Sequence, residues 1–185
     1  MRYFFIVGLV LLMCLTPSQL IAKTASAGAF TGYYHSAPQS ELPDGITFGV
    51  KGRLHLTWTF FIEPYFLYIH ETDKENQADN PTVQPNNLTI SSLGTNLIIG
   101  TSLDNFVRPY ALMGIGLFDV TTNTYGNKSQ RFGSNWGIGM EINLVRHQLF
   151  FDVNTTLQFI NHERNTAMIG TIVNGGLNWY FNIDK

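Results

Sequence analysis

The sequence contains one cysteine, Cys14, which lies within an apolar run near the N-terminus. The rest of the chain has no thiol, so it belongs to no class of small secreted domain that disulfides hold together. Downstream of that run, no apolar stretch reaches the roughly 20 residues that a membrane-spanning helix needs. If this protein crosses a membrane, it does so with strands.

The N-terminus has the features of an export signal. Arg2 supplies a positive charge, and Phe4–Leu15 is an apolar run too short to span a bilayer. Small residues, Ala25-Ser26-Ala27, then offer a cleavage point. The sequence therefore predicts a signal peptide over residues 1–27 and one mature domain over residues 28–185.

Basic residues are also scarce. The chain has 11 lysines and arginines against 13 aspartates and glutamates, and loss of Arg2 and Lys23 with the signal leaves nine basic residues and a formal charge of −4. A chain of this charge has no basic surface for nucleic acid, so we expect no nucleic-acid partner. What the sequence has in abundance is glycine and aromatic residues, with 17 glycines and 14% aromatics.

The closing segment Asn174–Phe181, NGGLNWYF, indicates how these aromatics are used. Residues two apart lie on one face of a strand, so Leu177, Trp179 and Phe181 form one apolar row. A soluble sheet buries such a row in its core. A barrel in a membrane presents it to lipid, with the aromatic end at the interface.

The chain reads as eight strands, most of them long enough to cross a membrane at a tilt. We expect them at Ala29–His35, Gly45–Leu56, Thr59–His70, Leu88–Gly100, Phe106–Asp119, Phe132–Val145, Gln148–Ile160 and Ala167–Phe181. Long and short connections alternate between them. The long ones are Ser36–Asp44, Glu71–Asn87, Val120–Arg131 and Asn161–Thr166, and the short ones lie near Thr57, Leu103–Asn105 and Arg146–His147. This alternation is typical of an outer-membrane barrel.

Alternation of apolar and polar residues is clearest in the sixth and seventh strands. Trp136, Ile138 and Met140 share one face, and Asn135, Gly137 and Glu141 share the other. A soluble barrel turns the apolar face inward, whereas a membrane barrel turns it outward. We favour the membrane arrangement, because the polar face is rich in glycine and amides and because eight strands cannot easily enclose the bulky aromatics.

Charged residues within the strands set which face is inside. A lysine or arginine facing lipid near the midplane costs roughly 2–4 kcal/mol, so such residues should point inward. Three cations and three carboxylates then meet in a narrow lumen: Lys51, Arg53, Glu63, Arg108, Glu141 and Asp152. Buried charges persist when they are paired, which favours a salt-bridged plug. Pro64 and Pro109 lie inside strands, where we expect a bulge or a missing ladder bond.

Three segments resemble the OmpA/OmpX-type family of small outer-membrane β-barrels: RPYALMGIGLF from Arg108, FGSNWGIGMEINL from Phe132, and the closing NGGLNWYF. The resemblance implies an all-β fold, an eight-stranded antiparallel up-and-down transmembrane barrel in the bacterial outer membrane. It also implies both termini in the periplasm, four loops outside the cell, and contact with outer-membrane lipid and lipopolysaccharide. The closing pattern of Asn174, Gly176, Trp179 and Phe181 resembles the signal that the outer-membrane assembly machinery recognises.

Some barrels of this size are lipid A enzymes, so possible catalytic groups need examination. Ser134-Asn135 matches part of a deacylase motif, but Phe132 stands where that motif has its histidine. Without that base nothing activates the serine. His35-Ser36 with Asp44 could be drawn as a triad at the outer rim. His35, His70 and His162 could be drawn as a metal site, but their spacing is irregular. We expect no catalytic residue, metal or cofactor.

We therefore expect a non-enzymatic surface protein. Its structural or adhesive role would rest on the polar loops, chiefly Glu71–Asn87 and Val120–Arg131, which would meet a host or surface ligand. A lipid A-modifying enzyme and a narrow solute conduit are the two alternatives.

Overall fold

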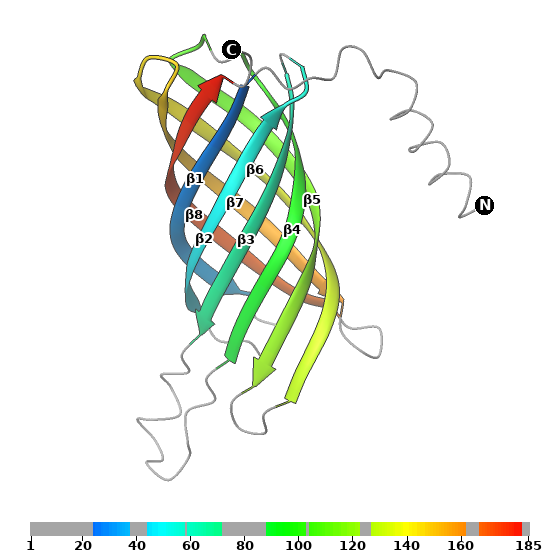
Figure 1. The fold of residues 1–185 in the computed structure, drawn as a ribbon. Coiled ribbons are helices and arrows are strands. Elements are labelled where there is room, and N and C mark those ends of the chain that lie inside the picture. Colours follow the sequence, from blue (N-terminus) through cyan, green and yellow to red (C-terminus); the bar gives the residue numbers. More distant parts are fainter. Residues whose placement is uncertain are drawn as a thin grey trace, which may run out of the picture.

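The computed structural model describes residues 24–37, 44–57, 59–71, 88–102, 104–122, 127–161 and 167–182. These residues form eight antiparallel strands in which each strand pairs with its neighbours in the chain and β1 also pairs with β8, so the sheet closes into a barrel (Figure 1). The strands are β1 Thr24–Ser36, β2 Gly45–His55, β3 Phe60–Glu71, β4 Leu88–Gly100, β5 Val107–Thr122, β6 Asn127–Val145, β7 Leu149–Asn161 and β8 Ala167–Asn182. The predicted eight-stranded up-and-down barrel is confirmed. No helix in the described part of the chain is long and apolar enough to span a membrane.

The two ends of the barrel differ. Connections 56–59, 101–106 and 146–148 lie at the end where β1 begins and β8 ends, which we call the turn end (Figure 1). The other four connections, 37–44, 72–87, 123–126 and 162–166, lie at the opposite end, which we call the loop end. The predicted loops Glu71–Asn87 and Asn161–Thr166 fall almost wholly outside the described residues.

One predicted loop is wrong. Val120–Arg131 was expected to be a long connection, but β5 continues to Thr122 and β6 begins at Asn127, with Val120 paired to Ser129. These polar strand ends lack the apolar outward face that a membrane strand requires, and the sequence therefore reads as a loop. A strand that extends beyond the hydrocarbon into water has no need of that face. β5 and β6 are 16 and 19 residues long.

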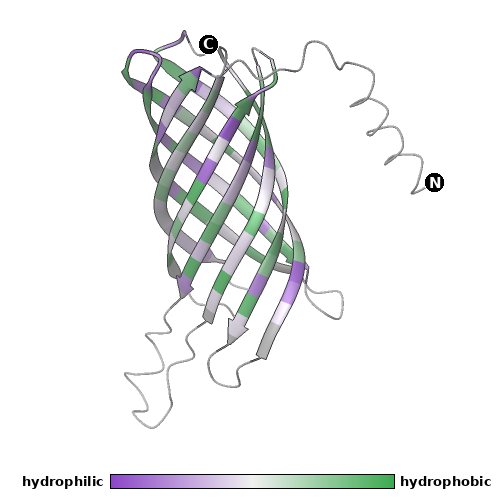
Figure 2. Ribbon diagram, viewed as in Figure 1, coloured by the Kyte–Doolittle hydropathy of each residue, from purple (hydrophilic) through white to green (hydrophobic). Residues whose placement is uncertain are grey.

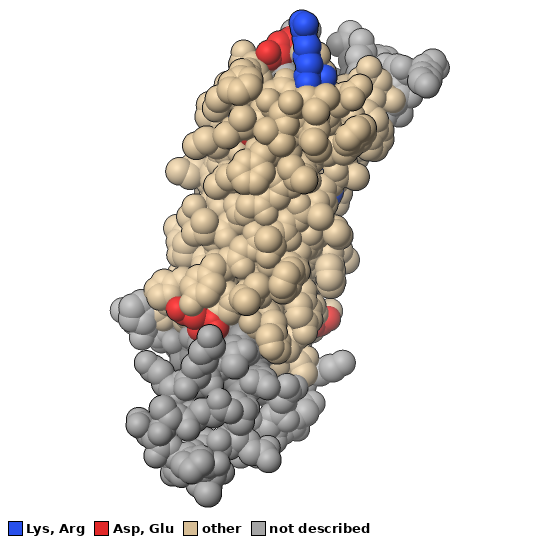
Figure 3. All heavy atoms as spheres, turned by 90° about the vertical axis from the view of Figure 1, so that its left-hand side faces the viewer, with Lys and Arg blue, Asp and Glu red and all other residues tan. Residues whose placement is uncertain are grey.

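The outward and inward faces follow the predicted phase. Trp136, Ile138 and Met140 are exposed on the outside of β6, while Asn135 and Glu141 are buried inside. Hydropathy alternates along the ribbons in Figure 2, and Figure 3 shows charged side chains gathered mainly at the two ends of a largely uncharged band. β4, whose phase the sequence left ambiguous, turns Leu93 and Leu97 outward and Ile90 and Ile98 inward.

The two prolines interrupt the ladder less than expected. Between β2 and β3 the paired positions stop at Lys51↔Tyr65 and resume at Leu54↔Ile62, which leaves a gap at Pro64 and confirms the expected missing ladder bond. Pro109 pairs continuously with β6, and the β4–β5 ladder begins one residue later at Tyr110. The bulge in the described strands lies elsewhere, between Asn143 and Val145 on β6.

β1 begins earlier than the predicted mature chain. Thr24 to Ala27 belong to this strand, and they pair with Asn182, Phe181, Tyr180 and Trp179 of β8. Cleavage before Gly28 would remove these four residues and leave the end of β8 without a partner on that side. Unpaired backbone groups are costly within a bilayer. The position of cleavage stays a prediction.

We expect the mature N-terminus to lie at or before Thr24, because this start preserves the whole β1–β8 seam. The intact mass of the protein purified from membranes measures the cleavage point directly. A mass that corresponds to a chain starting at Gly28 would contradict this expectation. A variant lacking residues 24–27 of the mature chain should refold less completely than one that retains them.

Candidate functional site

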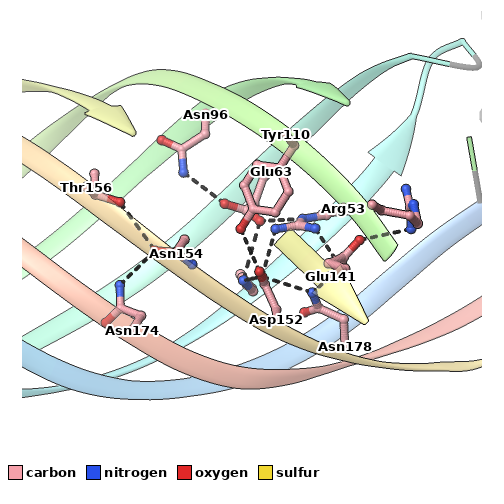
Figure 4. Close-up of polar contacts among 12 residues, drawn as sticks. Arg53, Glu63, Asn96, Tyr110, Glu141, Asp152, Asn154, Thr156, Asn174 and Asn178 are labelled. Atoms are coloured by element: carbon pink, nitrogen blue, oxygen red, sulfur yellow. Dashed lines mark hydrogen bonds and ion pairs between the residues drawn. The ribbon is translucent and has the colours of Figure 1, made fainter. Parts of the chain in front are cut away.

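The barrel interior is layered along its axis. At the loop end it is apolar, with a buried cluster of Tyr34, Tyr65, Leu67, Ile69, Ile90, Phe118, Val120, Ile160 and Ile172. Amides follow, where Asn135 donates to Asn96 at 2.6 Å and Asn174 donates to Asn154 at 3.2 Å. Nearer the turn end all six charged side chains predicted to face inward are buried together. Figure 4 labels four of them, namely Arg53, Glu63, Glu141 and Asp152. We call these six residues the ion cluster.

Arg53 lies at the centre of the ion cluster. Its Nε is 2.5 Å from Glu63 Oε2, its Nη1 is 2.7 Å from Glu141 Oε1, and its Nη2 is 2.9 Å from Asp152 Oδ2. The three carboxylates come from β3, β6 and β7. A guanidinium has five N–H donors in a fixed plane, so a single arginine on β2 connects three other strands.

The other two cations complete the charge balance. Lys51 pairs with Asp152 and lies 3.8 Å from Glu63 Oε2, and Arg108 Nη1 lies 2.9 Å from Glu141 Oε2. The cluster therefore contains three positive and three negative side chains. Such neutrality is needed because an unpaired charge in this buried space would cost several kcal/mol.

Neutral side chains satisfy the carboxylate oxygens further. Tyr110 Oη donates to Asp152 Oδ1 at 2.6 Å, and Tyr180 Oη lies 3.0 Å from both oxygens of Glu141. Asn96 Nδ2 donates to Glu63 Oε1 at 2.9 Å, and Asn178 Nδ2 donates to Glu141 Oε1 at 2.6 Å. Strand alternation places each of these four residues on the inward face with the charges, but the sequence alone does not predict which carboxylate each one meets.

Aromatic rings close the turn end around Arg108. The centre of its guanidinium lies 5.5, 5.1 and 5.5 Å from the ring centroids of Phe61, Phe150 and Tyr180. Cation–π contacts of this kind strengthen when the cation is removed from water. Arg108 is thus held by one carboxylate and three rings. Strand alternation places Phe61 on the same face as Glu63 and Phe150 on the same face as Asp152, but no local pattern predicts that these rings meet Arg108.

Glycines make room for the large inward side chains. A Cβ added to Gly139 would lie 2.5 Å from Tyr110 Oη, and one added to Gly170 would lie 2.3 Å from Tyr34 Oη. No side chain fits at either distance. Opposed tyrosine and glycine therefore fill the narrow lumen without overlap, which explains the glycine content of the inward faces.

Little space remains inside. A cavity of about 40 Å³ is bounded by Lys51, Glu63, Tyr65, Asn135 and neighbouring side chains. That is room for about one water molecule. Around Arg53, Phe61 and Arg108 the side chains leave no room for a water molecule. The apolar cluster at the loop end and the aromatic rings at the turn end lie above and below this cavity.

The catalytic arrangements considered from the sequence do not assemble. His35 Nδ1 lies 2.9 Å from both oxygens of Asp44, but His35 is exposed whereas Ser36 is buried, since neighbours on a strand point to opposite faces. Asp44 is partly desolvated, but hydrogen bonds from His35, the Ser36 N–H and Tyr33 outweigh this and lower the pKa of its carboxyl. Ser134 lies on the face of β6 that carries Trp136, away from the buried Asn135.

The histidines form no metal centre in the described part of the chain. His35 is at the end of β1 and His70 near the end of β3, with β2 between them, and His162 lies outside the described residues. No three His, Cys, Asp or Glu side chains within the described ranges are grouped to hold a metal ion.

The closing segment divides between the two faces of β8. Asn174 is buried and accepts a hydrogen bond from Thr47 at 3.0 Å, and Gly176 lies opposite Phe30. Trp179 and Phe181 are about half exposed on the outside. Both outward residues pair with alanines of β1, Ala27 and Ala25. Recognition of this segment by an assembly machinery stays a prediction.

A comparison with protein families identifies the chain. The family "Outer membrane protein beta-barrel domain" matches residues 7–181. This protein belongs to that family. It is an integral protein of the bacterial outer membrane, and the outward apolar band of the barrel faces lipid. No curated protein sequence matches the chain.

Several solved structures are similar to this barrel. Neisserial surface protein A has a TM-score of 0.67 and 12% identity, covering 85% of this chain and 97% of its own. The N-terminal barrel domain of OprF from Pseudomonas aeruginosa has a TM-score of 0.56 and 17% identity, and the match covers 86% of this chain and 98% of that domain. Ail, the attachment invasion locus protein of Yersinia pestis, has a TM-score of 0.55 and 12% identity, and the match covers 87% of this chain and 100% of Ail. At these identities the similarity is one of fold.

Replacing Arg53 should destabilise this outer-membrane barrel strongly. Arg53→Leu leaves three buried carboxylates with two cations, and breaking a buried pair by removing one partner costs roughly 3–5 kcal/mol. Urea-induced unfolding of the barrel in lipid vesicles measures the change in free energy.

Arg146→Leu is the matched control, because Arg146 is exposed in the turn between β6 and β7. It should change the unfolding free energy by no more than about 0.5 kcal/mol. Adding Asp152→Asn to Arg53→Leu should recover part of the loss, since it removes one uncompensated charge. Equal stability of Arg53→Leu and the control would mean that the ion cluster contributes nothing to the fold.

Proposed function

We propose that this outer-membrane barrel is a non-enzymatic scaffold that carries its function on the loops, in surface structure or in adhesion to a host or surface ligand. The observation that carries this proposal is the filled lumen. A barrel whose described interior is filled by side chains can act only through its lipid-facing band and its two ends.

Against a solute conduit stand three successive barriers. The apolar cluster at the loop end excludes water, the charges of the ion cluster are paired with one another, and the rings around Arg108 fill the turn end. A cavity of about 40 Å³ between them is no continuous path. Passage of an ion would require several buried pairs to separate at once.

Against a lipid A enzyme stands the separation of the candidate groups. His35 and Ser36 point to opposite sides of β1, so His35 cannot take the proton of that hydroxyl. Ser134 has no histidine at position 132, where Phe132 is exposed to lipid. The carboxylates of the lumen are held by cations and are out of reach of a lipid.

The arrangement of the two ends supports the loops as the active part. We place the turn end in the periplasm and the loop end outside the cell, as in the family that the sequence resembles. β5 and β6 extend furthest at the loop end and so support the loops beyond the membrane. Ail, which shares the fold, is named as an attachment and invasion protein; we propose a comparable surface role for different loops here.

Exchange of residues 73–86 for a Gly/Ser linker of equal length tests the proposal. We expect binding of the bacterium to host cells or to other bacteria to fall several-fold, while the barrel still folds and reaches the outer membrane. Folding is checked by the difference in gel mobility between unboiled and boiled samples. The short turn at 56–59 provides the control, since its exchange should leave surface binding unchanged.

Unchanged binding in every loop exchange would remove the adhesive part of the proposal. A change in lipid A mass between strains with and without the gene would instead favour the enzymatic alternative.

A further inference from the structure

The lipid-facing surface is hollowed on one side. Two adjoining hollows, of about 720 and 540 Å³, lie over β4 to β7 and share Ile99, Ala111, Ile138 and Thr155. Their lining is mostly apolar and includes Met113, Trp136 and Leu157 toward the middle of the barrel. We call the two hollows together the furrow.

Strand register explains the furrow. Ile99 pairs with Ala111, Ala111 with Ile138, and Ile138 with Thr155, so a small side chain on β5 lies between two isoleucines on its neighbours. Pro109, which is also exposed, lines the furrow between Ala111 and the turn end. A hydrocarbon chain lying over Ala111 contacts the two flanking isoleucines as well as the floor of the furrow.

The furrow ends at the turn end of the barrel, which carries a cation. It reaches Thr101 and Val107, where β4 finishes and β5 starts. β6 passes this end before the β6–β7 turn, because the Asn143 N–H donates to Phe106 O at 2.9 Å. Arg146 is exposed on that turn and its Nε donates to His147 Nε2 at 3.2 Å.

One acid is also present at this end. Asp104 Oδ1 lies 3.9 Å from His147 Nδ1. Arg146 has no carboxylate partner among the described residues, so its charge is available to an anion.

We propose that the furrow binds one acyl chain of a glycerophospholipid, with the phosphate of that lipid at Arg146. The chain runs from the turn end over Pro109 and Ala111 toward Trp136. Given the orientation under the proposed function, this lipid belongs to the periplasmic leaflet, and lipopolysaccharide, which lies in the other leaflet, is the alternative that the experiment must separate from it. The site lies at the opposite end from the loops, so failure of loop-dependent adhesion would leave it standing.

Native mass spectrometry of the detergent-solubilised barrel, titrated with palmitoyl-oleoyl phosphatidylglycerol, tests this site. We expect one lipid to bind more tightly than the rest. Ala111→Phe fills the floor of the furrow and should lower the occupancy of that lipid several-fold. Ala29→Phe is the matched control, since Ala29 is an exposed alanine on β1 outside both hollows, and it should leave the occupancy unchanged.

Arg146→Gln should reduce the occupancy by phosphatidylglycerol without changing the folded state, which heat-dependent gel mobility verifies for each variant. Equal occupancy in Ala111→Phe and the unaltered barrel would overturn the proposal, as would an equal loss in Ala29→Phe. An unchanged occupancy in Arg146→Gln would overturn the assignment of the phosphate. If the unaltered barrel retains lipopolysaccharide that Ala111→Phe releases, the lipid class and leaflet are wrong.

Discussion

Six charges must remain paired inside a sheet that has no edge. A bilayer offers no hydrogen bonds to backbone groups, so the strands have to close on one another, and closure encloses whatever the inward faces carry. Arg53, on β2, reaches carboxylates from β3, β6 and β7 and so connects the two sides of the barrel across its lumen. The position of each charged residue is fixed by the partner it must meet.

Pairing of these charges also supports the proposed function. An apolar cluster, an amide layer and the ion cluster fill the interior, which in our proposal stabilises the barrel wall and conducts no solute. We therefore propose that the surfaces carry the function. The two longest connections lie at the loop end, and the outer wall faces lipid, with a furrow over Ala111.

Most of the fold follows from the sequence because one physical rule, the period of two, acts on every strand. Alternation divides each strand into two faces, and the cost of exposing charge to lipid predicts that the face with Lys51, Glu63 or Asp152 is the inward one. The rule fails where both faces are apolar, as in β4, because the interior is not uniformly polar. It also fails where a strand leaves the membrane, as at Thr121 and Thr122. The rings around Arg108 and the role of Tyr110 depend on contacts between distant strands, which no local pattern contains.

Conductance of the barrel in a planar lipid bilayer is the most direct test of a closed lumen. The account predicts no discrete current steps above the leak of the bare membrane, at neutral pH and over voltages of either sign. Steady single-channel steps from the unaltered protein would contradict it. They would mean that the ion cluster opens under ordinary conditions, and that the interior serves a passage.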